Sequence, residues 1–247
     1  MDPQPLFVHR TLDFWDEDSG YRFVAASPEG EPELWAQFLE GARDAYRRFR
    51  VEVALEYDLI RDGTSTALFF VAVAADGTVH GGSRALGPYV SATESHPFVE
   101  WTDQAARAEI VRILGPCVPY GLVEAKTGWV ADGVPGRHEL SAGVARTATY
   151  FMELLGARFL VGTAADNALE MWRRAEACVV KDVPPTPYPD ERYSTRMLLW
   201  DLACCDSPRR SIEIEKLLSS NTVPGSWNLS RPYRRIDHRG ESNGVVS

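Results

Sequence analysis

The residues best suited to chemistry lie between positions 124 and 159. Glu124 falls inside a strand-like run, 122–130, which is followed by a loop with two glycines and by an apolar period that predicts a helix starting near Leu140. Small residues at a helix start let backbone N–H groups approach a phosphate or pyrophosphate. The residues in question are Ser141, Ala142, Gly143, Val144 and Ala145, with Arg146 after them. A carboxylate beside an anion cradle predicts a group-transfer enzyme with a phosphate-bearing carrier.

The surrounding pattern predicts one α/β or α+β domain over residues 21–202. Strand patterns alternate with helical ones, and a hairpin is centred on Asp76-Gly77. The expected strands are 21–26, 68–74, 79–86, 122–130, 159–163, 178–181 and 193–202, and the expected helices are 33–49, 102–114, 140–155 and 167–175. Residues 1–20 are expected to be irregular. Residues 203–247 are expected to be a largely flexible tail with at most one helix, 211–218.

Composition narrows the class of protein. With 45% hydrophobic and 25% charged residues, the 247-residue chain is ordinary for a globular protein. A net charge of −9 disfavours nucleic acid as a partner. The four cysteines lack metal-ligand spacing, so we expect reduced thiols, no disulfide and no metal. There is neither a signal-peptide pattern at the start nor an apolar run of roughly 18 residues, which predicts a cytoplasmic protein without a membrane span.

Several stretches resemble the N-acetyltransferase (GNAT) superfamily, and within it the autoinducer synthases (acyl-homoserine-lactone synthases) and the N-acyl amino acid synthases. The order of elements matches, and so do Phe49-Arg-Val-Glu-Val, Glu56-Tyr-Asp, Gly81-Gly-Ser-Arg-Ala-Leu-Gly-Pro, Leu122-Val-Glu and Arg174-Ala-Glu-Ala-Cys-Val-Val. The resemblance covers roughly residues 45–202. It implies a GNAT-like fold, with a mixed, mostly antiparallel central sheet flanked by helices. It also implies an N-acyltransferase that takes an acyl group from acyl-CoA or acyl carrier protein through the phosphopantetheine thioester.

The resemblance also suggests which residues line the acceptor pocket. Arg50, Asp58, Arg84 and Glu124 fall where the autoinducer synthases keep an arginine, an aspartate, an arginine and a glutamate. Thr127 stands where that family has another arginine, and Leu55 where it has an aspartate. These departures favour an amine acceptor other than that of the lactone synthases. The phosphate-loop pattern of the superfamily is matched only in its small residues.

Glu124, Arg84 and Asp58 are the predicted catalytic residues. A desolvated carboxylate with a raised pKa would accept the proton of an attacking amine, which makes Glu124 the candidate base. A purely structural pairing of Glu124 with Arg84 or Lys126 is the alternative. Arg84 lies in an apolar strand, so it should pair with Asp58 or Glu124, or bind a carboxylate of the substrate.

Other residues are predicted to contact the two substrates. An acyl tunnel would be lined by Trp101, Trp129, Phe151 and Trp172, although aromatic residues at such spacing also suit an ordinary core. The oxyanion donor would be a backbone N–H near 128–130. The arginines of residues 43–50, including Arg50, would form a basic lip on which an acidic carrier protein could dock. A short-chain acetyl-CoA-dependent N-acetyltransferase and an inactive GNAT-like binding module remain open as alternatives.

Overall fold

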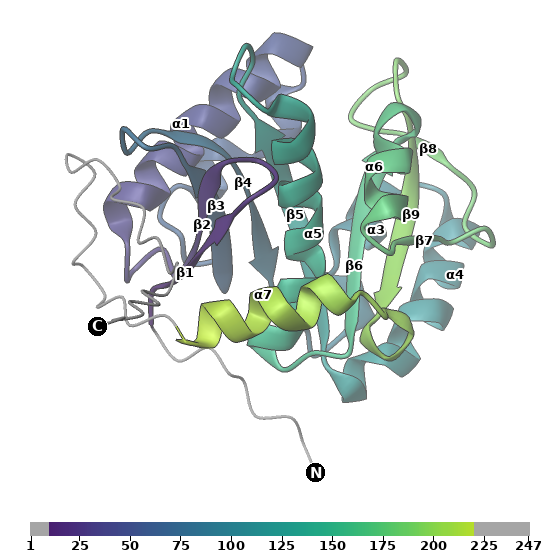
Figure 1. Cartoon of the computed structure of the whole chain (residues 1–247). Helices are drawn as coiled ribbons and strands as arrows, with labels where there is room; N and C mark the ends of the chain where they lie inside the picture. The colour runs from purple at the N-terminus through teal and green to yellow at the C-terminus, as the bar shows by residue number, and fades with distance from the viewer. Residues whose placement is uncertain (1–9, 220–247) are drawn as a thin grey trace, which may run out of the picture.

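A computed structural model of the chain describes residues 10–219, which form a single α/β domain around one mixed sheet (Figure 1). The sheet order is β1-β2-β3-β4-β5-β6-β9-β7, with β8 also paired to β9. Only the β5–β6 pair is parallel among these strands. The strands are β1 Leu12–Asp16, β2 Tyr21–Ala26, β3 Leu68–Val73, β4 Val79–Leu86, β5 Leu122–Val130, β6 Phe159–Ala165, β7 Cys178–Val179, β8 Thr186–Pro187 and β9 Ser194–Asp201. This mostly antiparallel sheet flanked by helices confirms the predicted fold class.

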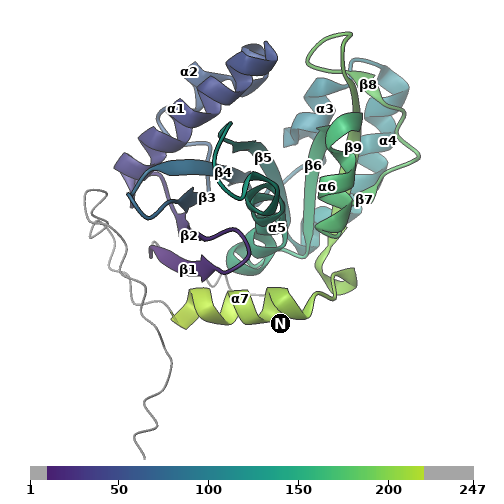
Figure 2. The same cartoon turned by 45° about the horizontal axis from the view of Figure 1, so that its top comes forward.

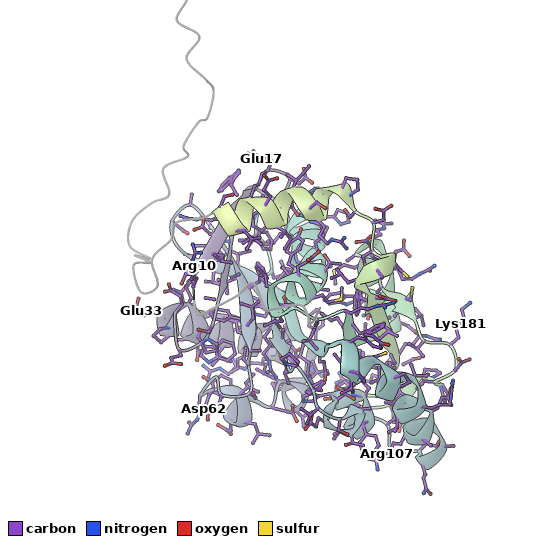
Figure 3. All side chains as sticks on the ribbon, turned by 90° about the horizontal axis from the view of Figure 1, so that it is seen from below. Arg10, Glu17, Glu33, Asp62, Arg107 and Lys181 are labelled. Atoms are coloured by element: carbon purple, nitrogen blue, oxygen red, sulfur yellow. The ribbon has the colours of Figure 1, made fainter. Side chains whose placement is uncertain are left out.

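Helices cover both faces of the sheet (Figure 2). One face carries α1 Pro32–Phe49, α2 Tyr57–Ile60, α3 His96–Glu100 and α4 Gln104–Leu114, and the other carries α5 Arg137–Leu155, α6 Leu169–Arg174 and α7 Pro208–Ser219. Short 3₁₀ turns join them at η1 Glu52–Leu55, η2 Ala92–Glu94, η3 Gly115–Tyr120, η4 Asp166–Ala168 and η5 Leu202–Cys204. Asp62, just after α2, and Arg107, on α4, lie along the edge opposite α7 (Figure 3). We call the face of the sheet that carries α1 to α4 the α1 face, and the face that carries α5 to α7 the α5 face.

Alternation along the strands assigns residues to the two faces. On β5, Leu122 packs in the core beneath α4, whereas its neighbour Val123 packs in the core beneath α5. Phe69 on β3 packs beneath α1, and Phe70 beneath α5. Glu124 follows the parity of Leu122, so its side chain lies on the α1 face.

Two elements differ from the sequence prediction. The segment 1–20 is not wholly irregular, because Leu12–Asp16 forms β1 with alternating burial. Its acidic residues hid the strand pattern, since Asp16 is buried and paired with arginines instead of facing solvent. The predicted helix 211–218 begins earlier, at Pro208, which suits the first turn of a helix. The remainder of the predicted tail, 220–247, lies outside the described residues.

The sheet opens between its two parallel strands. β5 and β6 pair at only three positions, ending with Glu124 opposite Val161. Beyond that point β5 stays with β4 as far as Val130, and β6 stays with β9. Thr127 within β5 has a left-handed backbone (φ 55°), which interrupts the ladder with β4 near Arg84. Backbone N–H groups of β5 are therefore left without a β6 partner next to the Glu124 side chain.

The glycine pair in β4 is needed for close packing. A Cβ on Gly82 would overlap the Phe70 carbonyl oxygen and lie 3.0 Å from the Phe38 ring of α1. We expect Gly82→Ala to lower the free energy of unfolding by about 2 kcal/mol, because backbone must shift to admit the methyl group. Gly115→Ala is the control, since a Cβ there has no neighbour within 4 Å. Urea denaturation measures both; equal midpoints for the two variants would show that β4 has room to spare.

Candidate active site

Glu124 lies at the centre of a buried group of polar side chains. It is fully buried, and its Oε2 accepts hydrogen bonds from the Tyr89 hydroxyl (2.7 Å) and from the backbone N–H of His96 (2.9 Å). Nδ1 of the His96 ring lies 3.3 Å from the same oxygen. Oε1 is buried and has no hydrogen-bond partner within residues 10–219. A buried carboxylate oxygen without a donor can receive one from a bound molecule.

The neighbours of Glu124 fix its charge. Burial acts to raise the pKa of Glu124, but the hydrogen bonds and charge of His96, together with the charge of Lys126, outweigh burial and lower the pKa below its usual value. Glu124 is therefore ionised at neutral pH. The raised pKa expected from the sequence is wrong, because that expectation included burial but not the donors that His96 brings from α3.

Glu100, at the end of α3, has the raised pKa that the sequence assigned to Glu124. Burial raises the pKa of Glu100; the Lys126 ammonium acts against this, while the charge of Glu124 adds to it. The Lys126 ammonium donates to Glu100 Oε1 at 3.4 Å. The site thus holds two buried carboxyl groups with pKa values shifted in opposite directions, an arrangement that is common where proton transfer occurs.

Glu56 and His96 connect this buried pair to the surface. Nε2 of His96 lies 3.3 Å from Glu56, and the Lys126 ammonium lies 3.9 Å from the same carboxylate. The side chains of Glu56 and His96 are 34% and 21% exposed, against 1% for Glu124. A substrate entering from solvent would therefore meet Glu56 and His96 first.

Arg84 is buried, and no carboxylate of residues 10–219 forms an ion pair with it. Its Nε donates to the Thr127 hydroxyl at 3.1 Å and its Nη1 to the Thr66 hydroxyl at 3.2 Å. Burial lowers the pKa of Arg84, and the nearby Glu124 offsets part of this effect. The predicted ion pairs with Asp58 or Glu124 are not formed among the described residues, and Asp58 is exposed at the start of α2. Arg84 holds the β5 bulge in place through Thr127.

Three tyrosines complete the site. Burial raises the pKa of Tyr46 to about 12 and also raises the pKa of Tyr89 and Tyr188, so all three are neutral donors at physiological pH. Together with these tyrosines, the charged residues and Thr127 form one group on the α1 face of the sheet. We call this group the polar cluster; its members are Tyr46, Glu56, Arg84, Tyr89, His96, Glu100, Glu124, Lys126, Thr127 and Tyr188.

The start of α5 lies on the opposite face from the polar cluster. Gly136 precedes the helix in a left-handed conformation (φ 62°), and the helix begins at Arg137. The N–H of Leu140 bonds to the Gly136 carbonyl, so the N–H groups without a helical partner are those of residues 137–139. A phosphate held by the dipole of this helix would contact these residues.

The predicted phosphate cradle, residues 141–146, falls inside the helix, so its place must be corrected. A Cβ on Gly143 would lie 2.6 Å from the Phe23 ring, and Val144 and Ala145 are buried in the core. Arg146 donates to Asp16 at 2.9 Å. The sequence prediction placed the helix start three residues too late, because the polar turn Arg137-His-Glu lacks an apolar period.

The predicted tunnel aromatics lie in four different places. Trp101 is buried in the core beneath α4. Phe151 is in the core beneath β3, 5.4 Å from the Phe70 ring. Trp129 is buried against α1. Trp172 of α6 is half-buried beside the opening, where a Cβ on Gly128 would lie 3.3 Å from its ring. Only Trp172 is placed to contact an acyl chain in the opening.

The predicted basic lip is largely neutralised. Arg43 pairs with Glu40, Arg47 with Asp44 at 3.1 Å, and Arg48 with Asp132 at 3.2 Å. Arg50 is exposed at the end of α1, where its carbonyl oxygen accepts from Arg192 at 2.8 Å. Paired exposed charges attract an acidic partner weakly.

Among residues 10–219, no cluster of three or more His, Cys, Asp or Glu is arranged to hold a metal ion. Nor is any helix in that range apolar and long enough to cross a membrane.

Fold and site define a single-domain α/β protein whose sheet opens beside a buried cluster of charged side chains. The chain belongs to the same family as two mycobacterial proteins that carry no assigned function, the uncharacterized protein Mb1391c of Mycobacterium bovis and the uncharacterized protein Rv1356c of Mycobacterium tuberculosis. Each is 39% identical to it over 199 residues, which span 81% of this chain and 76% of the relative. No protein-family model matches the chain.

Solved structures with a similar fold include FeeM, an N-acyl amino acid synthase from uncultured soil microbes (13% identity, TM-score 0.49, covering 74% of this chain and 92% of FeeM). BjaI, a CoA-dependent acyl-homoserine lactone synthase, has 13% identity and a TM-score of 0.48, covering 86% of this chain and 92% of BjaI. NAA60 of Arabidopsis thaliana, solved with acetyl-CoA, has 15% identity and a TM-score of 0.47, covering 73% of this chain and 98% of NAA60. These proteins come from the groups that the sequence resemblance named.

Proposed function

We propose that this protein is an N-acyltransferase that moves an acyl group from a thioester carrier to an amine by direct attack. One observation carries the proposal. The sheet opens at Glu124 beside a buried cluster of carboxylates on the α1 face, and the start of α5, whose first N–H groups have no helical partner, lies on the other face of the same sheet. Such a site can hold an amine on one side and a phosphate-bearing thioester on the other.

The carboxylates divide the work on the amine. Glu124 is ionised and has one oxygen without a donor, so it holds and orients the ammonium group. Its lowered pKa makes it a poor proton acceptor, whereas the raised pKa of Glu100 suits that role. Glu124 is thus the positioning carboxylate and Glu100 the base. Asp58 is outside the cluster and takes no part.

The reaction balances without a further reactant. Glu100 takes a proton from the ammonium, the amine nitrogen attacks the thioester carbon, and a C–N bond forms. Backbone N–H groups of β5 past Glu124, which have no β6 partner, stabilise the oxyanion. The C–S bond then breaks, the leaving thiolate takes the second proton that the nitrogen releases as the amide forms, and Glu100 returns its own proton to solvent.

The donor is proposed to be acyl-CoA instead of an acyl carrier protein. Recognition of the carrier protein would need unpaired cations near the opening, and three of the four arginines of the predicted lip are already bound to carboxylates. The N–H groups of residues 137–139 would hold a CoA phosphate. A cytoplasmic location remains part of this proposal.

Turnover with a panel of thioesters tests the function. The protein is incubated with acyl-CoA of increasing chain length, or with matching acyl carrier proteins, in the presence of amino acids and other primary amines. We expect release of CoA thiol together with an amide product detected by mass spectrometry. Absence of thiol release and of amide with every donor would reject the enzyme and favour an inactive binding module.

A further inference from the structure

A second site lies away from the polar cluster, where three helices of the α5 face meet (Figure 1). A cavity of about 120 Å³ lies between the middle of α5, the end of α6 and the start of α7. It is lined by Arg146, Thr149, Tyr150, Arg174, Ala175, Glu176, Ser207 and Arg210. By volume it holds about four water molecules, which is room for one tetrahedral oxyanion.

The side chains that line the cavity carry more positive than negative charge, and each lining arginine also has a carboxylate beside it outside the lining: Asp16 at 2.9 Å from Arg146, Glu170 at 3.1 Å from Arg174 and Glu153 at 3.5 Å from Arg210. Three guanidinium groups line it, and Glu176 is its one lining carboxylate. That carboxylate is already engaged, because Oε1 of Glu176 accepts from the backbone N–H of Asp206 at 2.8 Å. The lining is therefore suited to an anion and unsuited to a metal cation or an amine.

Several donors at this cavity have no acceptor. Nε of Arg146 and both Nε and Nη1 of Arg210 are buried and make no hydrogen bond within the described part of the chain. Glu213 lies 3.6 Å from Nε of Arg146 and Glu153 lies 3.5 Å from Nε of Arg210, in each case without forming a hydrogen bond. Arg146 donates instead through Nη2, to Asp16 at 2.9 Å. The two arginine side chains are only 19% and 14% exposed, so solvent replaces these bonds poorly.

The end of α6 and the contact between α5 and α7 fix the walls of the cavity. α6 ends at Ala175, whose carbonyl oxygen accepts from the Trp200 indole at 2.7 Å, and Glu176 turns the chain with a left-handed φ of 69°. Tyr150 of α5 donates to Glu213 of α7, which fixes α7 against α5. The arginines are thus held on three separate helices around a fixed space.

We propose that this cavity binds a phosphate-type oxyanion, with Arg146, Arg174 and Arg210 as its ligands. Bound there, the anion joins α7 to α5 and α6. The site is separate from the polar cluster, because it lies beneath the end of α6 on the α5 face, while the polar cluster lies on the other face of the sheet.

Inorganic phosphate is the probe for the test. Calorimetric titration and thermal unfolding are compared in phosphate and in chloride at equal ionic strength. We expect the wild-type protein to bind phosphate and to unfold at a higher temperature in it. Arg210→Met should weaken phosphate affinity about tenfold or more. Arg174→Gln, at a side chain that is 68% exposed and not needed for folding, should weaken it in the same direction.

Arg173→Gln is the matched control, since Arg173 is one residue away on the same helix, is 63% exposed and does not line the cavity. The proposal is overturned if phosphate and chloride act alike on the wild type, or if Arg173→Gln weakens binding as much as Arg174→Gln. Titration at saturating CoA identifies the source of the anion. If saturating CoA leaves the phosphate affinity of the wild type unchanged, the natural ligand of the cavity is free phosphate. If CoA competes with phosphate in the wild type and no longer competes in Arg174→Gln, the ligand is a phosphate of the carrier.

Discussion

Replacing Glu124 with glutamine is expected to lower kcat/KM for amide formation about a thousandfold. The amide keeps an oxygen that can accept from Tyr89 and His96, so the fold is retained, but the charge that holds the ammonium is lost. Measurement is by thiol release with the best acyl-CoA found in the panel. Glu109→Gln on α4 is the control, because Glu109 pairs with Arg112 outside the cluster and its loss should leave turnover unchanged.

The pH profile separates the roles of the two carboxylates. The charge of Glu124 raises the pKa of Glu100, so removing that charge lowers the Glu100 pKa. In Glu124→Gln the rising limb of the rate against pH should therefore move to lower pH and persist. In Glu100→Gln the limb due to the carboxyl should vanish. The opposite pattern, with the limb lost in Glu124→Gln and kept in Glu100→Gln, would make Glu124 the base.

Asp16→Asn is expected to lower the free energy of unfolding by about 3 kcal/mol. The Asp16 carboxylate is completely buried and accepts from Arg146 at 2.9 Å, from the Ser19 hydroxyl at 2.6 Å, and from Arg209 of α7. Asparagine keeps part of the hydrogen bonding, but Arg146 and Arg209 then share one buried carboxylate, Glu213, where the wild type has two. Urea denaturation measures the loss.

Asp18→Asn provides the comparison for Asp16. Asp18 pairs with the same Arg209 but is 58% exposed, so solvent screens the pair and the variant should unfold almost as the wild type does. Equal effects of the two substitutions would show that exposure does not decide the strength of this network, and would contradict the expectation.

The fold was predictable wherever a local pattern was consistent with the tertiary packing. The hairpin followed from Asp76-Gly77, and Gly77 takes the positive φ (90°) that the turn requires. The predicted helix 102–114 is α4, which begins at Gln104; its cap is the Asp103 carboxylate, which accepts from the Ala106 N–H at 2.8 Å. β1 was missed because its acidic residues do not alternate with apolar ones in the usual way.

The site was predictable only in part. Glu124 and Arg84 stood out as charges within apolar strands, and both are buried near one another. His96 and Glu100 come from the short helix α3, and Glu56 precedes the short helix α2, up to 68 residues away in sequence from Glu124. Such short elements show no local period that would mark these residues. The pairing of two arginines of the basic lip was predictable from the sequence, however. Glu40 and Asp44 stand three residues before Arg43 and Arg47, a spacing that brings the side chains together on one helix face.

The opening between β5 and β6 has a consequence for how acceptor choice can change. The groups proposed to hold the amine come mainly from residues 46–101 and β5, whereas those proposed to hold the carrier come from the start of α5 across the sheet. Grafting residues 50–101 from a mycobacterial relative should therefore exchange the amine that is acylated and leave the preferred thioester unchanged. Acceptor specificity in this family can then diverge, or be engineered, without rebuilding donor recognition.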